Sequence, residues 1–459
     1  MTGFKKAIVF IVFCFLLSGN ISFAEEASIR EEINRLKARL KVLEDKLIRQ
    51  DKCITDQKQC MVEQDKKIAD YEIKLSKFDT DLHRQTGVPI SIAEGLEIGA
   101  GATMVIQGAS NVNSASADVE KKTSRTDGSY STDITLAKEF EGVGGRAFLH
   151  LENGQSDGIE DSLTLYSNVN RDADNDVNVR VTEVWYEQEL FNDKAVISFG
   201  KLDPTAYFDN NEVANDETTQ FLGRMFRNAP TIDFPDNTLG IRLAYLLKDW
   251  VELSYGVFNA NGGWKKINDN LFNMGQVAFK TSFFDLAGNY RFYGWNNNTY
   301  YTKWLDTEKT KESGYGFGLS FDQKLNDALT LFCRYGWQDP SVYSPDISTI
   351  AGGLNYSLEQ SWSMGLQLEG KPWGRENDVL GFAAGQVFAS SDYKKAGELL
   401  DPARRAKPEG HLEAYYKIFV NKYLSLSPDF QYIWNPFGKD VAEDTAPIFV
   451  GGMRAQVDF

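Results

Sequence analysis

The chain has 459 residues, a formal net charge of −16, and many Phe, Tyr and Gly residues. An acidic chain lacks the basic patches that nucleic-acid binding requires, so nucleic acid is excluded as a partner. After the N-terminal residues, no segment supplies the roughly 18 consecutive apolar residues of a membrane helix, which excludes a helical membrane protein. The composition is typical of outer-membrane barrel strands, although a large secreted β-sandwich enzyme shares it.

The first 24 residues predict a signal peptide. Two lysines precede an apolar run over 7–17, and the triplet Ser22-Phe23-Ala24 supplies small residues at a cleavage point. Removal of this segment, with its two lysines and no acidic residue, takes the formal charge to −18. We therefore expect an exported chain that begins after the triplet.

Residues 25–86 predict a periplasmic coiled coil. Over 28–83, apolar residues alternate at spacings of three and four through eight heptads that contain no Pro or Gly. Three successive Gln layers, at positions 50, 57 and 64, interrupt one seam. A coiled coil implies self-association, so we expect a homo-oligomer, with a trimer favoured and peptidoglycan as a further candidate partner. The alternative is a solvated single helix.

The four cysteines give little information on function. Cys14 leaves with the signal peptide, and Cys333 lies among apolar strand positions. On a continuous helix, Cys53 and Cys60 are about 10 Å apart, too far for a bridge within one helix. We expect them to be free or paired between chains in an oxidising compartment. Because no His or Cys cluster has metal-ligand spacing, neither a metal site nor a cofactor is predicted.

From 87 onward the apolar period changes to that of β-strands, which predicts a barrel domain over 87–459. Gly87-Val88-Pro89 ends the helix. In 238–247 and 250–259, apolar residues alternate with small or polar ones on either side of a short corner, as in a hairpin. Similar alternation occurs at 286–295, 328–338, 361–371, 411–420 and 424–434.

Connection lengths predict the topology. The long polar segments lie near 109–128, 154–178, 203–236, 260–271, 296–312, 338–360, 391–409 and 435–446. The short turns lie near 140–143, 191–193, 248–249, 283–285, 323–327, 372–378 and 421–423. Eight long and seven short connections predict 16 antiparallel strands with both ends on the short-turn side, as in outer-membrane barrels. Residues 349–357 leave 18 strands open as an alternative. The final strand alternates from Phe449 to Phe459, and a terminal Phe resembles the outer-membrane assembly signal.

In a spanning barrel the apolar face of each strand meets lipid and the polar face lines the lumen. This rule predicts inward Glu183, Trp185, Glu187, Arg242, Glu252, Asn289, Arg291, Tyr293, Trp295, Arg334, Gln367, Glu369, Glu413, Lys417, Asp429, Gln431 and Arg454. A strongly ion-selective pore carries one sign of charge. Mixed charges with aromatic rings instead favour a neutral hydroxylated solute. The alternative is that these charges merely pair across the wall and hydrate the lumen.

Several segments resemble a known family. They are RVTEVWYEQEL at 180–190, FGKLD at 199–203, FDNNEVANDETTQFL at 208–222, PWGREND at 372–378, EAYY at 413–416 and LSPDFQYIWNP at 426–436. They look like the carbohydrate-selective porins of Gram-negative outer membranes (OprB type). The resemblance implies a 16-stranded barrel, diffusive sugar uptake, and a third long loop, here 203–236, folded inward as the constriction. Its candidate residues are Asp209, Asn211, Arg224 and Arg227.

The leading hypothesis is therefore a passive outer-membrane pore for small hydrophilic solutes, with saccharides favoured. Its expected partners are outer-membrane lipid and small sugars or other hydrophilic solutes. The alternative is a non-specific or ion-preferring porin whose coiled coil mainly tethers the outer membrane to the cell wall. An enzyme is disfavoured because no Ser-Gly motif accompanies His150 or His411. Asp172, Asp174 and Asp176 resemble part of a calcium loop but lack its Gly and terminal Glu, so we predict a solvated acidic loop, with a surface calcium site as the alternative.

Overall fold

The computed structural model describes residues 95–114, 123–140, 142–283, 286–345, 349–350, 354–402, 404–440 and 446–459. The chain divides into two units, Met1–Ile92 and Ala93–Phe459, and the described residues all belong to the second. The signal peptide and the coiled coil predicted for 1–24 and 25–86 lie outside the described residues.

Sixteen long strands form the wall of the second unit. They are β1 (Leu96–Ser110), β2 (Arg125–Phe140), β3 (Gly145–Gln155), β4 (Arg180–Leu190), β5 (Ala195–Leu202), β6 (Thr238–Lys248), β7 (Val251–Asn259), β8 (Leu271–Phe283), β9 (Leu286–Lys303), β10 (Glu312–Lys324), β11 (Leu329–Gln338), β15 (Leu358–Glu369), β16 (Val379–Ala389), β17 (Glu409–Asn421), β18 (Leu424–Trp434) and β19 (Ile448–Asp458). Each pairs antiparallel with its neighbours in the sheet.

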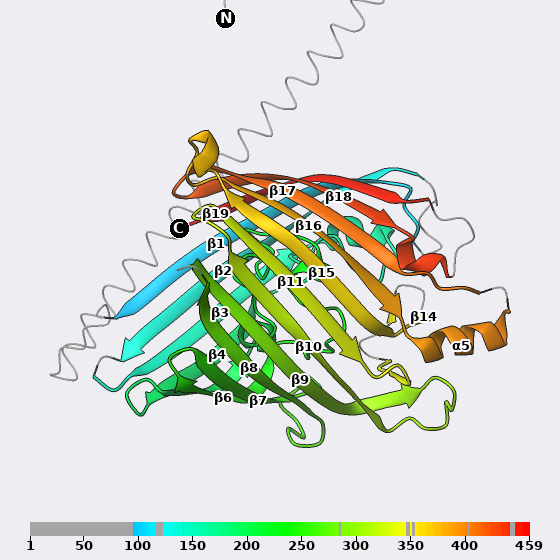
Figure 1. Ribbon diagram of the computed structural model, residues 1–459, viewed down its shortest axis with the longest axis horizontal. Coiled ribbons are helices and arrows are strands. Elements are labelled where there is room, and N and C mark those ends of the chain that lie inside the picture. The colour runs from blue at the N-terminus through cyan, green and yellow to red at the C-terminus, as the bar shows by residue number, and fades with distance from the viewer. Residues whose placement is uncertain are drawn as a thin grey trace, which may run out of the picture. The chain divides into compact units, whose positions relative to one another are not determined.

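The sheet closes on itself because its first and last strands pair. The β1–β19 register runs from Gly101 opposite Asp458 to Ser110 opposite Phe449, and β1 also pairs with β2 along its length. Closure leaves no open edge, so the backbone groups of the wall are satisfied within the sheet, as lipid surroundings require. The predicted 16-stranded antiparallel barrel is confirmed (Figure 1).

The remaining elements are short and lie in the connections. They are η1 (Gly158–Ser162), α3 (Pro204–Tyr207), α4 (Arg224–Arg227), β12 (Val342–Tyr343), β13 (Thr349–Ile350), β14 (Leu354–Asn355), η2 (Lys371–Trp373), α5 (Ser391–Leu400) and η3 (Pro436–Lys439). In Figure 1, η2 lies at the short-turn end of the strands and α5 at the long-loop end. No helix in the described ranges is long and apolar enough to cross a membrane.

Two details of the connections refine the predicted topology. The β13–β14 hairpin pairs only with itself, so it belongs to the sixth long loop and adds no strand to the wall. The fifth long loop is shorter than expected, because β9 continues to Lys303. Asn296 pairs with Tyr315 of β10, and Asn297 with Phe272 of β8. Backbone hydrogen bonding between strands does not depend on apolar side chains, so the apolar pattern could not show that β9 continues through these asparagines.

The two faces of the wall differ in exposure as a lipid-spanning strand requires. On β6, Ile241, Leu243 and Tyr245 are 46%, 48% and 41% exposed, whereas the alternating Ala244 is 6% exposed. The outer face is therefore apolar, and the inner face is covered by other parts of the chain.

The interior is filled partly by the connection between β5 and β6, which runs inside the wall (Figure 1). Phe221, Met225 and Phe226 of this segment pack in one buried cluster with Phe332 of β11 and Tyr415 of β17. Gly336 of β11 makes room for the segment, because a Cβ there would lie 2.0 Å from Thr231 Oγ1. The wall and the segment are thus shaped to fit each other.

Candidate constriction site

Two long loops enter the barrel. Loop 2 is residues 156–179, between β3 and β4, and loop 3 is residues 203–237, between β5 and β6. Ile159, Leu163 and Val169 of loop 2 pack with Ile433 and Val450 of the wall in a separate buried cluster. Apolar contacts of this kind hold each loop against the wall and leave its polar side chains to face the remaining space.

Loop 3 crosses the interior and contacts strands that lie far from its own ends. The backbone N–H of Asp209 donates to Gln276 Oε1 of β8 at 3.1 Å, and Asn211 Nδ2 donates to Ser320 Oγ of β10 at 3.2 Å. Further along, Thr231 Oγ1 lies 3.2 Å from Ser361 Oγ of β15. These contacts fix loop 3 on several sides.

A buried ion pair anchors the middle of loop 3. Arg334 Nε of β11 lies 3.4 Å from Asp209 Oδ1, and both side chains are almost wholly buried. Arg334 also donates to the carbonyl oxygens of Asp209 and Phe226, at 3.0 and 2.6 Å. Burial raises the pKa of Asp209, while Arg334 and the N–H of Ala229 oppose that rise. The arginine therefore holds the loop both as a charge and as a hydrogen-bond donor.

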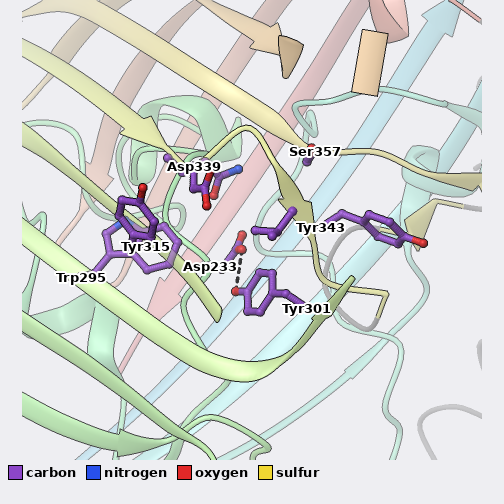
Figure 2. Close-up of a pocket in the computed structure, with 10 residues that line it drawn as sticks. Asp233, Trp295, Tyr301, Tyr315, Asp339, Tyr343 and Ser357 are labelled. Atoms are coloured by element: carbon purple, nitrogen blue, oxygen red, sulfur yellow. Dashed lines mark hydrogen bonds between the residues drawn. The ribbon is translucent and has the colours of Figure 1, made fainter. Parts of the chain in front are cut away.

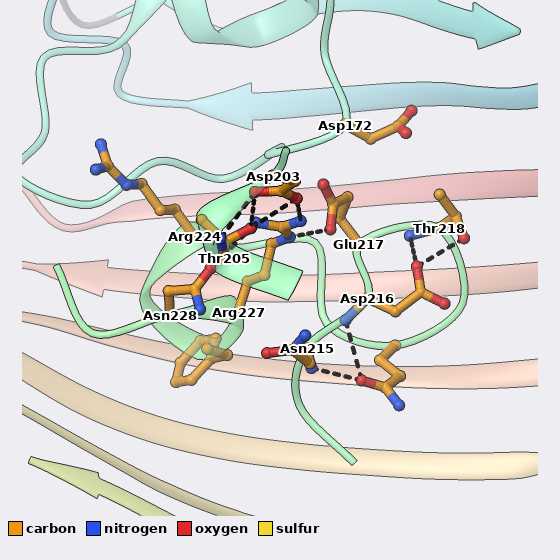
Figure 3. Close-up of polar contacts among 12 residues, drawn as sticks. Asp172, Asp203, Thr205, Asn215, Asp216, Glu217, Thr218, Arg224, Arg227 and Asn228 are labelled. Atoms are coloured by element: carbon orange, nitrogen blue, oxygen red, sulfur yellow. Dashed lines mark hydrogen bonds and ion pairs between the residues drawn. The ribbon is translucent and has the colours of Figure 1, made fainter. Parts of the chain in front are cut away.

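Arg227 of α4 is the centre of a polar cluster on loop 3 (Figure 3). It forms ion pairs with Glu217 and, at 3.7 Å, with Asp203, and its Nη1 donates to Thr205 Oγ1 at 2.9 Å. Burial lowers the pKa of Arg227, but Glu217 and Asp203 overcome this effect and raise it overall. Asp203 also caps α3 by accepting from the N–H of Thr205 at 2.8 Å.

Arg171 of loop 2 and Arg224 of loop 3 stand beside this cluster. The Arg171 guanidinium lies within electrostatic range of Arg224, Arg227, Glu217 and Asp203, yet its side chain stays exposed. In Figure 3 the side chain of Arg224 points away from the Arg227 ion pairs. Within the described part of the chain, neither Arg171 nor Arg224 forms an ion pair. By exposed area, Arg171 is exposed and Arg224 is half-buried.

Asp172 contributes a carboxyl group to the same region. Both of its oxygens lie 3.1 Å from Ser131 Oγ of β2, which donates to them. Burial, followed by the charge of Glu217, raises the pKa of Asp172 to about 8. The carboxyl group is thus mostly protonated at neutral pH and can donate as well as accept.

The β4–β7 side of the lumen carries inward residues that are partly exposed. Trp185 Nε1 donates to Glu183 at 3.0 Å, and Glu187 accepts from Ser198 Oγ at 2.6 Å. Arg242 lies 3.5 Å from Glu252 and 4.8 Å from the ring centroid of Tyr207 of loop 3. These predicted lining residues bind mainly one another, and their lining role stays a prediction.

The β17–β19 side differs, because its predicted lining residues are buried under the loops. Glu413 accepts from the N–H groups of Leu222 and Gly223 at 2.6 and 2.9 Å. Gln431 Nε2 donates to the Val169 carbonyl and to Asp429, each at 2.8 Å. Arg454 Nη1 donates to the Glu217 carbonyl at 2.6 Å. Glu413 and Gln431 have no exposed surface. The structure therefore places these side chains against loop backbone.

The other predicted residues are spread around the wall. Arg291 Nη1 lies 2.6 Å from Asp322 Oδ2, and Tyr293 and Trp295 pack in the cluster that contains Phe208 of loop 3. Gln367 accepts from Tyr415 at 3.4 Å, and Asn289 donates to Asp322 at 2.6 Å. Lys417 is half-buried. Glu369 pairs with Lys371 at 3.1 Å, at the short-turn end and apart from the loop cluster.

The sequence did not place Arg171, Asp172, Glu409 or His411 at the constriction: it predicted a solvated loop for Asp172, which is instead mostly buried, and it offered His411 only as a disfavoured catalytic candidate. The first two lie on loop 2, for which no inward course was expected. Glu409 and His411 could have been found from the sequence, because they alternate with Glu413 on one face of a strand.

A small pocket lies at the long-loop ends of β9, β10 and β11 (Figure 2). Tyr301 donates to Asp233 Oδ2 at 2.8 Å, and Trp295 Nε1 finds no partner in the described ranges. The pocket offers about 10 Å³, room for about one water molecule. It is therefore too small for a sugar. The described residues also contain no group of three His, Cys, Asp or Glu side chains that could hold a metal ion.

A closed 16-stranded antiparallel barrel with an apolar outer face, a polar interior and inward-folded long loops defines the class of outer-membrane channels. The model of the carbohydrate-selective porin, OprB family, matches residues 121–459, and the chain belongs to this family. Its fold and family are those of channels and not of enzymes.

The chain is also similar to three individual proteins. OprB of Pseudomonas putida in its high-pH structure is 18% identical, with a TM-score of 0.64 over 80% of this chain and 94% of that one. The outer-membrane channel DcaP of Acinetobacter baumannii is 10% identical, with a TM-score of 0.49 over 80% and 98%. An uncharacterized protein of Aquifex aeolicus (strain VF5) is 24% identical over 58% of this chain, and the match spans 65% of its length.

Proposed function

We propose that this outer-membrane channel lets small saccharides diffuse through a constriction made by loops 2 and 3. The observation that carries the proposal is the juxtaposition of Arg171, Arg224, Arg227 and Glu217 inside the barrel. Guanidinium groups supply several donors in a fixed plane, and carboxylates accept, so together they match the hydroxyl groups of a sugar. The cluster carries both signs of charge, because Asp203 and Glu217 lie beside the three arginines, and mixed charge favours a neutral solute over an ion.

Flux requires that such contacts stay weak. Passage through a pore needs binding that is favourable enough to enter and weak enough to leave. Arg227 is held by its ion pairs with Glu217 and Asp203, so a hydroxyl group must compete with them. Partly exposed Glu183, Glu187 and Arg242 on the facing wall are proposed as further weak contacts along the path.

Liposome swelling tests the proposal. The full chain is reconstituted, and swelling rates are compared for monosaccharides and zwitterionic amino acids of equal size. We expect faster entry of the sugars, and a smaller difference for the double variant Arg171→Ala/Arg224→Ala, which loses two guanidinium groups that form no ion pair with any described residue. Equal rates for the two solute classes in the wild type contradict the saccharide preference and leave a general pore.

The heptad pattern within 25–86 supports a second, structural role. We propose that, after removal of residues 1–24, this segment forms a periplasmic coiled coil that associates chains, as a trimer, and contacts the cell wall. Deletion of 25–86 is expected to weaken envelope attachment, measured by the release of outer-membrane vesicles, and to leave sugar flux per channel unchanged. Loss of flux with intact attachment contradicts a tethering role.

A further inference from the structure

Three successive inward positions of β17 lie under the loops that form the constriction. Glu409, His411 and Glu413 alternate along one face of the strand, and all three are wholly buried. Burial of a carboxylate without hydrogen bonds is strongly unfavourable, so the partners of Glu409 and Glu413 account for their presence in the interior. Those partners are loop residues, which ties this one strand to the geometry of the pore.

Glu409 binds two different loops. It accepts from the N–H of Tyr166 at 3.0 Å and from the N–H and Oγ of Ser167, each at 2.8 Å, all on loop 2. It also accepts from the N–H of Phe437, on the last long loop, at 2.6 Å. The carboxylate thus receives four donors from two segments of chain.

Glu413 binds loop 3 just before α4. Its two oxygens accept from the N–H groups of Leu222 and Gly223 at 2.6 and 2.9 Å. A Cβ at Gly223 would lie 2.7 Å from Glu413 Oε2 and 3.1 Å from His411 Cε1. Gly223 has a φ of −68°, which any residue can adopt, so the absent side chain serves close approach to β17.

The same strand also connects the two loops to each other. His411 Nδ1 lies 3.1 Å from Ser167 Oγ, and the N–H of Arg171 donates to the Leu222 carbonyl at 2.8 Å. The N–H of Arg224 donates to Asn168 Oδ1 at 2.8 Å. The backbone of Arg171 is therefore bound to Leu222, which Glu413 holds, and the backbone of Arg224 is bound to Asn168, the residue after Ser167, which Glu409 holds.

We propose that Glu409 and Glu413 are positioning residues that set the width and the solute selectivity of the channel from the barrel wall, without touching the solute. The inference rests on the channel proposed above, but not on saccharides being its solute. Ion conductance reports pore width for any solute, so failure of the sugar preference and failure of this inference give different results.

The test uses single-channel conductance in KCl with the full chain. Glu413→Ala is expected to raise the conductance about twofold and to reduce discrimination between mono- and disaccharides, because loop 3 leaves the wall and the opening widens. Glu413→Gln is expected to restore part of the change, because its carbonyl oxygen accepts one N–H while its amide group faces the other. The matched control is Glu359→Ala: Glu359 of β15 accepts from the N–H of Ser391, outside loops 2 and 3, at 2.9 Å. Its conductance is expected to equal that of the wild type.

Gly223→Ala provides an independent arm that leaves the wall unchanged. As a single variant it should raise the conductance. Combined with Glu413→Ala it should cause no further rise, because both substitutions disrupt the same contact between loop 3 and β17. It also decides the question if Glu413→Ala does not assemble. Wild-type conductance in Gly223→Ala, additive effects of the pair, or an equal rise in Glu359→Ala would each overturn the proposal.

Discussion

The two sides of the lumen carry the same types of polar residue, but these residues have different partners on each side. On the β17–β19 side, Glu413 and Gln431 are wholly buried and bind the backbone of loops 2 and 3. On the β4–β7 side, Glu187, Arg242 and Glu252 stay partly exposed and bind mainly side chains of the wall, with Tyr207 of loop 3 beside Arg242. The difference teaches that a polar residue on the inner face of a strand becomes an anchor where loop backbone covers it and stays partly exposed where it does not.

Arg334 of β11 gives the largest test of this difference, because loop 3 covers it as the loops cover the β17–β19 side. Arg334→Leu leaves the buried carboxylate of Asp209 without its partner, which costs about 3–5 kcal/mol of unfolding free energy. Urea unfolding of the refolded barrel measures the loss, and conductance should rise as loop 3 is released. Unfolding at the wild-type urea concentration contradicts an anchoring role for Arg334.

Gln431 tests the covered side with a neutral residue. Gln431→Leu removes donors to the Val169 carbonyl and to Asp429 and the contact with His411 Nε2, so buried polar groups lose their partners. We expect a loss of about 1–3 kcal/mol in unfolding free energy. The same urea titration measures it. Tyr432→Leu, on the next position of β18 and facing outward by alternation, is the control and should lose less.

Asp172 tests the electrostatics of the space between the two sides. Its pKa is about 8 against an ordinary 3.8, so the group is neutral below pH 8 and charged above it. Asp172 lies near Glu217, Asp133 and Arg454. Its negative charge, formed as pH rises from about 7 to about 9, should increase the preference of the channel for cations. The reversal potential in a KCl gradient measures this shift, and Asp172→Asn should show none of it.

The same raised pKa has a consequence for stability. Between pH 3.8 and about 8 the folded chain holds a proton on Asp172 that the unfolded chain has lost, so this group makes stability fall as pH rises through that window. Asp172→Asn should therefore flatten the pH dependence of unfolding there. A dependence as steep as that of the wild type contradicts a buried neutral carboxyl group.

Substitution of Arg242 is expected to change the unfolding free energy least, because this residue lies on the β4–β7 side, where the inward residues are partly exposed. Its ion pair with Glu252 at 3.5 Å is partly exposed, and such pairs contribute about 0–1 kcal/mol. Arg242→Leu should leave urea unfolding nearly unchanged, in contrast to the same substitution at Arg334. A loss as large as that of Arg334→Leu would remove the distinction between the two sides.

The wall could be predicted from the sequence because its signals are local. Alternation of apolar and polar residues fixes each strand, and the alternation of long and short connections fixes the number of strands at 16. The course of loop 3 followed from resemblance to a family, since the segment at 208–222 matches it. The outward faces, such as Ile241 and Leu243 on β6, followed from the same period of two.

The anchors could not be predicted in this way, because they join distant parts of the chain. Tyr166 and Glu409 are 243 residues apart, and Leu222 and Glu413 are 191 apart. Alternation showed that Glu413 faces inward, but it does not say which loop lies over that face. His411 likewise could be weighed only as a catalytic candidate, whereas the structure shows it hydrogen-bonded between Ser167 and Gln431.

The measurement that tests the central claim most directly is single-channel recording while a monosaccharide is titrated. If loops 2 and 3 form a polar constriction that contacts sugars, the sugar should reduce the KCl conductance of the wild type to a saturating level. Arg171→Ala/Arg224→Ala should need a higher sugar concentration for the same reduction. A decrease that only follows the viscosity of the solution, equal in both proteins, would contradict the account.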